Sequence, residues 1–398
     1  MHTKRYCTLQ HGLLVATCTS LLRLPTTCFL PTTCTAFIPP CHLHHHAPYI
    51  KSLQLPVATT NSESYSANPS VDRQQIHPQQ HRHPEPLAEL PMKRLKLPKG
   101  AAGNDFVAIP VKIDGQGPFD FMLDTALTSE IITPELQKTL GISDDNAMKV
   151  EGLAAGGSKG EEKLVMLEGV SLSEEGRDIE LPPLHAIVTD FPEEKIDPAH
   201  TVDGMLCIET LELFDVDFDF PAGVVRLWPA GTAASVAEER GMISIPAAIV
   251  NDETYLLAIR ITSEKSLQKK RQPFLGIVDI GASFSTCNWE AAKLLEELPK
   301  NKIAYIGSPT VMAVGVDNKP IPMPMKDVAL TFLGGASQNE HGKVEFEQPP
   351  SSWKPWNKVK VGVGDLPVFS LALGDKDHPF KGPAAVIGLD VLSQRKWP

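Results

Sequence analysis

Acidic residues are absent from the first 61 positions of this 398-residue chain, although basic residues occur there. A basic segment without aspartate or glutamate is typical of targeting presequences. The apolar run at residues 12–22, which follows Lys4 and Arg5, has the length of a signal-peptide core and is too short to span a bilayer. We therefore predict a targeting presequence over residues 1–62 and no membrane anchor.

The stretch Cys34–Pro39 resembles the small-residue-then-Phe junction between the signal and transit peptides of complex plastids. This resemblance favours a plastid, with the mitochondrion and the secretory pathway as alternatives. Residues 63–102 are rich in Gln, His, Pro and Ser and have almost no aliphatic periodicity, so we predict a disordered linker there. The histidine-rich stretches at 42–46 and 77–83 fit low-complexity sequence better than metal binding.

Cysteine is scarce in the rest of the chain. Five of the seven cysteines precede residue 42, which leaves Cys207 and Cys287 and excludes both a disulfide framework and zinc-type spacing. Beyond residue 100 the chain carries 27 Lys and Arg against 44 Asp and Glu, a net charge near −17. Nucleic acids and anionic membranes require a basic surface, so we expect neither as a partner.

The acidic part of the chain contains a tandem repeat. Segments 118–124 and 273–279 align without gaps at an offset of 155, and each is an apolar strand that ends in an aspartate. Nine residues after each aspartate comes a good N-cap residue, Thr133 or Asn288, and a short helical pattern follows it. The pattern predicts strand, acid, turn and short helix, twice.

Each copy closes with a second matched segment. Residues 205–211 parallel residues 386–392 at an offset of 181, and the extra residues are explained by an insertion rich in Gly, Ser and Pro around 334–358. We predict one lobe over 103–230 and a second over 245–398, joined by a connector at 229–241.

Glycine-rich segments 28 to 38 residues after each aspartate, Gly152–Gly157 and Ala313–Asp317, are predicted to be flap-like hairpins. The first does not fit a phosphate-binding loop, because Ser158 and Lys159 come in the wrong order and no helical pattern follows. Aromatic residues are missing between Phe121 and Phe191, so the first flap has no tyrosine.

These residues resemble the aspartic proteases, and among them the retropepsin-like group. Phe121–Ala126 is similar to the first hydrophobic-hydrophobic-Asp-[Thr/Ser]-Gly signature, and Ile277–Ser283 to the second. Val386–Gly388 resembles the hydrophobic-hydrophobic-Gly element beneath the active-site loop, and Asp203–Leu206 takes its place in the first copy. The resemblance covers 103–398 and implies an all-β, two-lobed acid-protease fold, each lobe being a retropepsin-like β unit with one short helix.

The resemblance also implies that Asp124 and Asp279 form a catalytic pair in a shared cleft. Two carboxyl groups within hydrogen-bond reach cannot both ionise cheaply, so one proton is shared. The ionised member acts as general base on a water molecule and the protonated one donates to the scissile carbonyl, which requires no metal or organic cofactor. By the same resemblance, the active-site loops are supported by Thr125, Ala126, Gly281, Ala282, Ser283 and Gly388, and the flaps carry Gly156, Gly157 and Gly315.

The chain departs from the family pattern at four places. Ala126 replaces the glycine of the first signature, which implies strain if that position needs a positive φ. Ile280 replaces the hydroxyl residue of the second signature, so half of the hydrogen-bonded clasp between the two loops is missing. Cys207 replaces the closing glycine of the first copy, and the second copy reaches Pro398 without a counterpart of Phe218–Trp228.

We predict an aspartic endopeptidase, active as a monomer, that cleaves polypeptides held in an extended conformation along the cleft. The departures leave open a pseudoprotease that binds or regulates peptides, and a purely structural role. Separately, Asp215, Asp217 and Asp219 alternate with apolar residues, which we interpret as the solvated face of a strand.

Overall fold

The computed structural model describes residues 8–9, 85–153, 159–174, 177–250, 255–296, 305–315, 319–338, 344–347, 353–374 and 377–394. All of them belong to one compact unit. Within these ranges no helix has the length and apolar character needed to cross a membrane.

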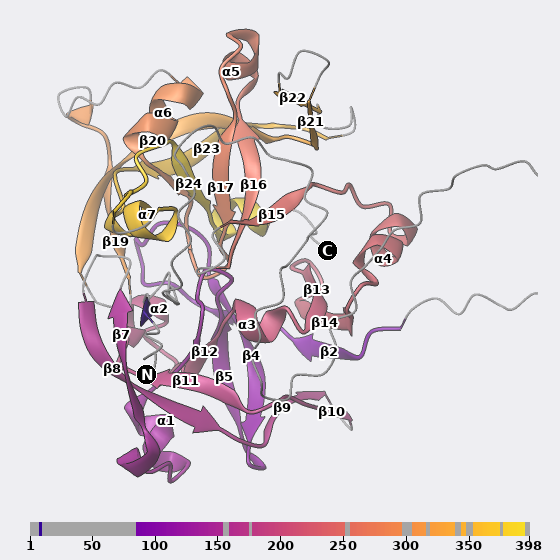
Figure 1. Cartoon of the computed structure of the whole chain (residues 1–398), viewed down its shortest axis with the longest axis vertical. Coiled ribbons are helices and arrows are strands. Elements are labelled where there is room, and N and C mark those ends of the chain that lie inside the picture. The colour runs from indigo at the N-terminus through magenta and orange to yellow at the C-terminus, as the bar shows by residue number, and fades with distance from the viewer. Residues whose placement is uncertain are drawn as a thin grey trace, which may run out of the picture. The chain divides into compact units, whose positions relative to one another are not determined.

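The first lobe is built on one large sheet (Figure 1). Its strands follow the order β1-β7-β8-β11-β6-β12-β5-β4-β9-β10, and β3 pairs with β4. The bounds are β1 (Thr8–Leu9), β3 (Lys93–Leu95), β4 (Phe106–Ile113), β5 (Gln116–Leu123), β6 (Glu130–Ile132), β7 (Met148–Leu153), β8 (Lys159–Leu167), β9 (Val170–Glu174), β10 (Arg177–Glu180), β11 (Leu184–Val188) and β12 (Gly204–Leu206).

The second lobe has its own sheet, in the order β15-β16-β17-β24-β18-β23-β20-β19. These strands are β15 (Ala247–Val250), β16 (Leu256–Thr262), β17 (Phe274–Val278), β18 (Thr286–Cys287), β19 (Thr310–Val314), β20 (Pro320–Phe332), β23 (Trp356–Val363) and β24 (Ala384–Ile387). Two smaller sheets consist of β13 (Phe214–Asp219), β14 (Val224–Pro229) and β2 (Ala88–Pro91), and of β21 (Ala336–Gln338) and β22 (Val344–Phe346).

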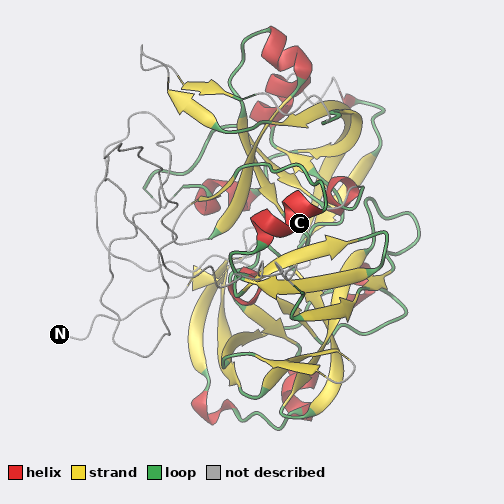
Figure 2. Ribbon diagram, turned by 90° about the vertical axis from the view of Figure 1, so that its right-hand side faces the viewer, coloured by secondary structure: helices red, strands yellow, loops and turns green. Residues whose placement is uncertain are grey.

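Short helices connect the strands (Figure 2). They are α1 (Pro134–Thr139), the 3-10 turn η1 (Asp144–Asn146), α2 (Glu193–Ile196), α3 (Ile208–Leu211), α4 (Ala233–Glu239), α5 (Glu264–Gln268), α6 (Trp289–Glu296), α7 (Pro367–Ala372) and α8 (Leu389–Leu392). The predicted all-β, two-lobed class is confirmed. The lobes hold more short helices than the one apiece that we predicted, because pieces of four to six residues leave almost no periodic signal.

The two lobes repeat the same pairing around their aspartates. β12 runs parallel to β5 with Gly204 beside Phe121, and β24 runs parallel to β17 with Ala385 beside Gly276. Since 276 is 121 plus 155 and 385 is 204 plus 181, these are the offsets read from the sequence. The structure thus brings the two matched segments of each copy together as neighbouring strands.

Both predicted helix caps are present. The N–H of Leu136 donates to Oγ1 of Thr133 at 3.1 Å at the start of α1, and the N–H of Ala291 donates to Oδ1 of Asn288 at 2.9 Å at the start of α6. Each cap satisfies a backbone donor that the first helical turn leaves unpaired.

The folded part begins earlier than the predicted linker boundary at 102. β2 pairs with β14 and β3 pairs with β4, and Leu90 and Leu95 are fully buried. Strands of three or four residues present only one or two apolar side chains, so alternation could not reveal them.

The interpretation of the three alternating aspartates is wrong for two of them. Asp217 and Asp219 are buried, and both accept hydrogen bonds from Arg226. Arg240, which follows α4 in the predicted connector, also pairs with Asp217. The cations that pair with these aspartates lie on other elements. The alternation within the strand therefore predicted a solvated face.

Candidate active site

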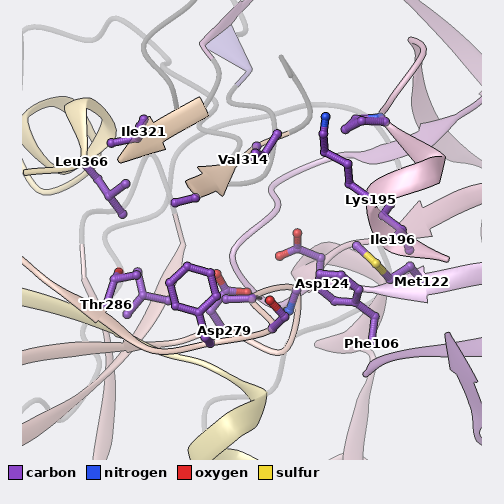
Figure 3. Close-up of a pocket in the computed structure, with 18 of the residues that line it drawn as sticks. Phe106, Met122, Asp124, Lys195, Ile196, Asp279, Thr286, Val314, Ile321 and Leu366 are labelled. Atoms are coloured by element: carbon purple, nitrogen blue, oxygen red, sulfur yellow. Dashed lines mark hydrogen bonds between the residues drawn. The ribbon is translucent and has the colours of Figure 1, made fainter. Parts of the chain in front are cut away.

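Asp124 and Asp279 lie side by side at the ends of equivalent strands. Asp124 follows β5, and its N–H donates to the carbonyl oxygen of Leu206 at 3.0 Å. Asp279 follows β17, and its N–H donates to the carbonyl oxygen of Ile387, also at 3.0 Å. The two side chains hydrogen-bond to each other and face one pocket (Figure 3).

The loop after each aspartate holds its carboxyl group in the same way. Oδ1 of Asp124 accepts from the N–H of Ala126, and Oδ1 of Asp279 accepts from the N–H of Gly281, both at 2.8 Å. Both carboxyl groups are almost completely buried, at 1% and 2% exposure. Backbone N–H groups thus fix one oxygen of each acid and leave the other for the shared proton and a reactant.

Burial shifts the ionisation of the pair. It raises the pKa of Asp124 to about 7, outweighing the hydrogen bonds that this carboxyl accepts from the N–H groups of Ala126 and Leu127. Burial and the neighbouring charge of Asp124 raise the pKa of Asp279 well above its ordinary value. Near neutral pH the pair therefore keeps a proton, which is the state that acid and base catalysis by two carboxyls requires.

Gly281 has no room for a side chain. A Cβ added there would lie 2.3 Å from Cγ of Asp124, far inside van der Waals contact. The equivalent residue of the first lobe, Ala126, does carry a Cβ, and it packs with Leu256, Ile277 and Val368 in a buried cluster. Ala126 does not have a positive φ, so the strain expected at this position is absent.

The clasp between the two loops is present from one side. Oγ1 of Thr125 donates to the carbonyl oxygen of Val278 at 2.8 Å and accepts from the N–H of Ile280 at 3.1 Å. Ile280 has no hydroxyl to return these bonds and is buried at 4% exposure. Thr125 thus connects the first loop to the second. The buried apolar side chain of Ile280 takes the place of the hydroxyl group that would form the equivalent bonds from the second loop.

The remaining predicted support residues lie in the second active-site loop and below it. The carbonyl oxygen of Ala282 accepts from the N–H of Leu389 at 2.8 Å, and the N–H of Gly388 donates to Oγ of Ser285 at 3.0 Å. Oγ of Ser283 donates to the carbonyl oxygen of Ala102 at 3.2 Å, in the segment between β3 and β4 of the other lobe. Ser283 therefore connects the two lobes.

The pocket at the aspartates has a volume of about 160 Å³ and takes its walls from both lobes. Val314, Ile321 and Leu366 stand across from the acids, and Met122, Ile196 and Lys195 lie at the first-lobe side (Figure 3). This volume is below that of sites for whole small molecules. The pocket has room for individual side chains of a peptide bound in an extended conformation.

Gly315 lines this pocket, on the hairpin formed by β19 and β20. The other two predicted flap residues, Gly156 and Gly157, lie outside the described residues. The strands that lead to them, β7 and β8, pair in antiparallel register from Met148 opposite Leu164 to Leu153 opposite Lys159.

Sequence reasoning missed two polar residues of the pocket. Thr286 lies seven residues after Asp279 in β18, and its Oγ1 is buried without a hydrogen-bond partner among the described residues. Lys195 comes from α2, which is 71 residues from Asp124 in sequence. The strand pattern after the second signature was a signal for Thr286, whereas nothing in the sequence tied Lys195 to the cleft.

Comparison with known proteins finds a family match for part of the first lobe. Residues 109–210 match the family model described as aspartyl protease, and no curated protein matches the chain. Among solved structures, a retropepsin-like aspartic protease from Rickettsia conorii is 14% identical, with a TM-score of 0.22, over 35% of this chain and 90% of that one.

Two seed globulins are also similar in structure. Basic 7S globulin from soybean is 9% identical, with a TM-score of 0.39, over 76% of this chain and 89% of that one. Conglutin gamma, a basic 7S globulin from lupine seeds, is 10% identical, with a TM-score of 0.37, over 78% and 91%. The family match, together with the paired aspartate loops, confirms the predicted resemblance to aspartic proteases.

Proposed function

On this aspartyl-protease-like framework, we propose that the protein is an aspartic endopeptidase that cleaves polypeptides bound in an extended conformation. The observation that carries the proposal is the contact between two buried carboxyl groups that come from equivalent loops of two lobes. Burying two acids together costs free energy, and the surrounding loops are built to hold them there.

The proposed mechanism assigns different roles to the two acids. Asp124, whose hydrogen bond with Asp279 favours its ionised form, takes a proton from a water molecule as that water attacks the scissile carbonyl carbon. Asp279 gives its proton to the carbonyl oxygen. The tetrahedral intermediate then collapses. The C–N bond breaks, the leaving amine takes the proton held by Asp124, and one hydroxyl group of the intermediate returns a proton to Asp279 as the new carboxyl group forms.

The walls of the pocket support the proposed substrate class. Apolar side chains from both lobes surround the acids, together with Oγ1 of Thr286, which has no hydrogen-bond partner in the part of the chain that the structure describes. A peptide in extended conformation would place apolar side chains against these walls and a polar group near Thr286.

Cleavage of a peptide library by the purified full chain tests the proposal. We expect turnover by the wild type, loss of at least about a thousandfold in Asp124→Asn and in Asp279→Asn, and inhibition by statine-type transition-state analogues. Asp120→Asn is the matched control, because Asp120 lies in the same strand but pairs with Lys93 instead of facing the pocket. Turnover that survives both active-site substitutions would refute the mechanism.

A peptide-binding protein without turnover is the second candidate. It is favoured by Ile280, which leaves the clasp between the loops one-sided. In that case labelled peptides bind the wild type and both Asn variants alike, and no product forms at any pH.

Plastid targeting and a monomeric state remain predictions. A fluorescent protein fused behind residues 1–62 tests the first, and sedimentation of the purified chain tests the second.

A further inference from the structure

A second cluster of reactive side chains lies behind the first active-site loop. Glu130 of β6, Cys207 and Glu209 of α3 place one ligand atom each within 4.8 Å of one another. Sγ of Cys207 is 3.0 Å from Oε1 of Glu130, which also accepts from Oγ1 of Thr210 at 2.5 Å. Nothing in the sequence suggested this grouping, because Glu130 is 77 residues from Cys207.

Glu130 has an acceptor that the described residues leave unused. Its side chain is 1% exposed, and Oε2 is buried without a hydrogen-bond partner among them. A buried carboxylate oxygen with no partner is costly. The described protein groups therefore leave one hydrogen-bond acceptor of the cluster, Oε2 of Glu130, without a partner.

The second lobe provides an internal comparison. At the repeat offsets, Glu130 corresponds to Ser285, Cys207 to Gly388 and Glu209 to Asp390. There, Oγ of Ser285 donates to Oδ1 of Asp390 at 2.7 Å and accepts from the N–H of Gly388 at 3.0 Å. One hydroxyl and one carboxylate satisfy each other in the second lobe, whereas the first lobe has two carboxyls and a thiol at the same place.

All three residues differ from their counterparts in the second lobe. We infer that Glu130, Cys207 and Glu209 bind a divalent cation of the zinc class. A thiolate and two carboxylate oxygens are ligands that zinc accepts, and water completes a tetrahedral site. Binding releases the thiol proton to solvent and supplies the missing partner of Oε2 of Glu130. Glu209 is exposed, so the site opens to solvent on one side.

The cation would act as a structural clip beneath the catalytic loop. Leu206, next to Cys207, accepts the N–H of Asp124 at 3.0 Å, and Ile208 donates to the carbonyl oxygen of Leu127 at 3.1 Å. A metal ion held at Cys207 thus fixes the two backbone contacts that support the loop of Asp124. This inference does not depend on peptidase activity.

Titration of the chelator-treated full chain with Zn(II), and with Co(II) as a spectroscopic probe, tests the site. We expect the wild type to bind one more ion than Cys207→Gly, which has the residue of the second lobe, and one more than Glu209→Gln. The comparison between the wild type and the variants is needed because histidine and cysteine side chains before residue 84 also take up metal ions. Their contribution is the same in all three proteins and cancels in the difference. The extra Co(II) should add thiolate-to-metal absorption that both variants lack.

Glu212→Gln is the matched control, since Glu212 is an exposed acid just after α3 and lies outside the cluster. It should bind like the wild type, whereas Glu209→Gln should raise the dissociation constant at least about tenfold. Equal uptake by the wild type, Cys207→Gly and Glu209→Gln would overturn the inference. In that event the two carboxyls share a proton in place of a metal.

Discussion

The carboxyl groups of Asp124 and Asp279 set how the protein responds to pH. The pKa of Asp124 is raised to about 7 and that of Asp279 is raised well above its ordinary value, so both acids become protonated as the pH falls below neutral. A pair with two protons has no general base. We predict that kcat/KM falls about tenfold for each pH unit below 7, because the base form of Asp124 disappears. A pH profile of peptide cleavage measures this, and a maximum near pH 4 would contradict it.

The same pKa shift affects stability, with a definite sign. The folded protein binds more protons than the unfolded chain between the ordinary carboxyl pKa of about 4 and the folded value of about 7. The stabilising contribution of Asp124 is therefore complete below pH 4 and is lost as the pH rises through 7. Melting curves of the wild type and Asp124→Asn should diverge over this window, with the variant gaining in relative stability toward pH 7.

Gly281 and Ala126 occupy equivalent positions but tolerate different changes. We predict that Gly281→Ala reduces kcat/KM by about a hundredfold or more, because the new Cβ would lie 2.3 Å from Cγ of Asp124 and displace the carboxyl. Ala126→Gly is the matched reverse change. It removes one buried methyl group and should cost about 1 kcal/mol of stability, with activity within a few-fold of the wild type. Peptide cleavage and urea unfolding of both variants distinguish the two effects.

At the scale of elements, the repeat was readable because its signals are local. A strand ending in aspartate, an N-cap nine residues later and a closing apolar segment all recur at fixed offsets, and the structure pairs β5 with β12 and β17 with β24 as these offsets require. Features that depend on distant partners were not readable. Arg226 and Arg240, which pair with Asp217, lie on elements other than its own strand, and the short strand β2 pairs with β14, which is far along the chain.

Helix α2 contributes Lys195, the one basic residue among the described residues that line the pocket. Lys195 is 44% exposed, and it forms an ion pair of 3.5 Å with Glu194, which is also exposed. A substrate carboxylate bound beside Lys195 would form an exposed ion pair with it, and such a pair contributes little free energy. We predict that the protein prefers Glu over Gln in the adjacent substrate position by about two- to fivefold, and that Lys195→Met abolishes this preference.

Competition between paired peptides measures the preference of each variant. Lys138→Met serves as the control, because Lys138 is exposed on α1 and does not line the pocket. An unchanged preference in Lys195→Met would exclude this lysine as a determinant of specificity.

At the scale of the whole described unit, the contact between Asp124 and Asp279 exists only while the two lobes keep their register. Thr125 is one tie between them, and the segment before β4 is another. There, the N–H of Asn104 donates to the carbonyl oxygen of Ser283 at 2.8 Å, and Nδ2 of Asn104 donates to the carbonyl oxygen of Leu389 at 3.2 Å and to Oγ of Ser393 at 2.7 Å. Asn104 thus joins the start of the first lobe to the active-site loop and last helix of the second.

We predict that Asn104→Ala lowers the free energy of unfolding by about 2 kcal/mol, because two side-chain hydrogen bonds are lost at a partly buried contact. It should also lower kcat/KM, since the loop that carries Asp279 is no longer held against the first lobe. Thr139→Ala is the control, as it removes one side-chain bond within α1, in a single lobe. Calorimetry should show one sharp transition for the wild type and control, and a broader or divided one for Asn104→Ala. A variant with the wild-type transition and wild-type activity would mean that the lobes are held together without Asn104.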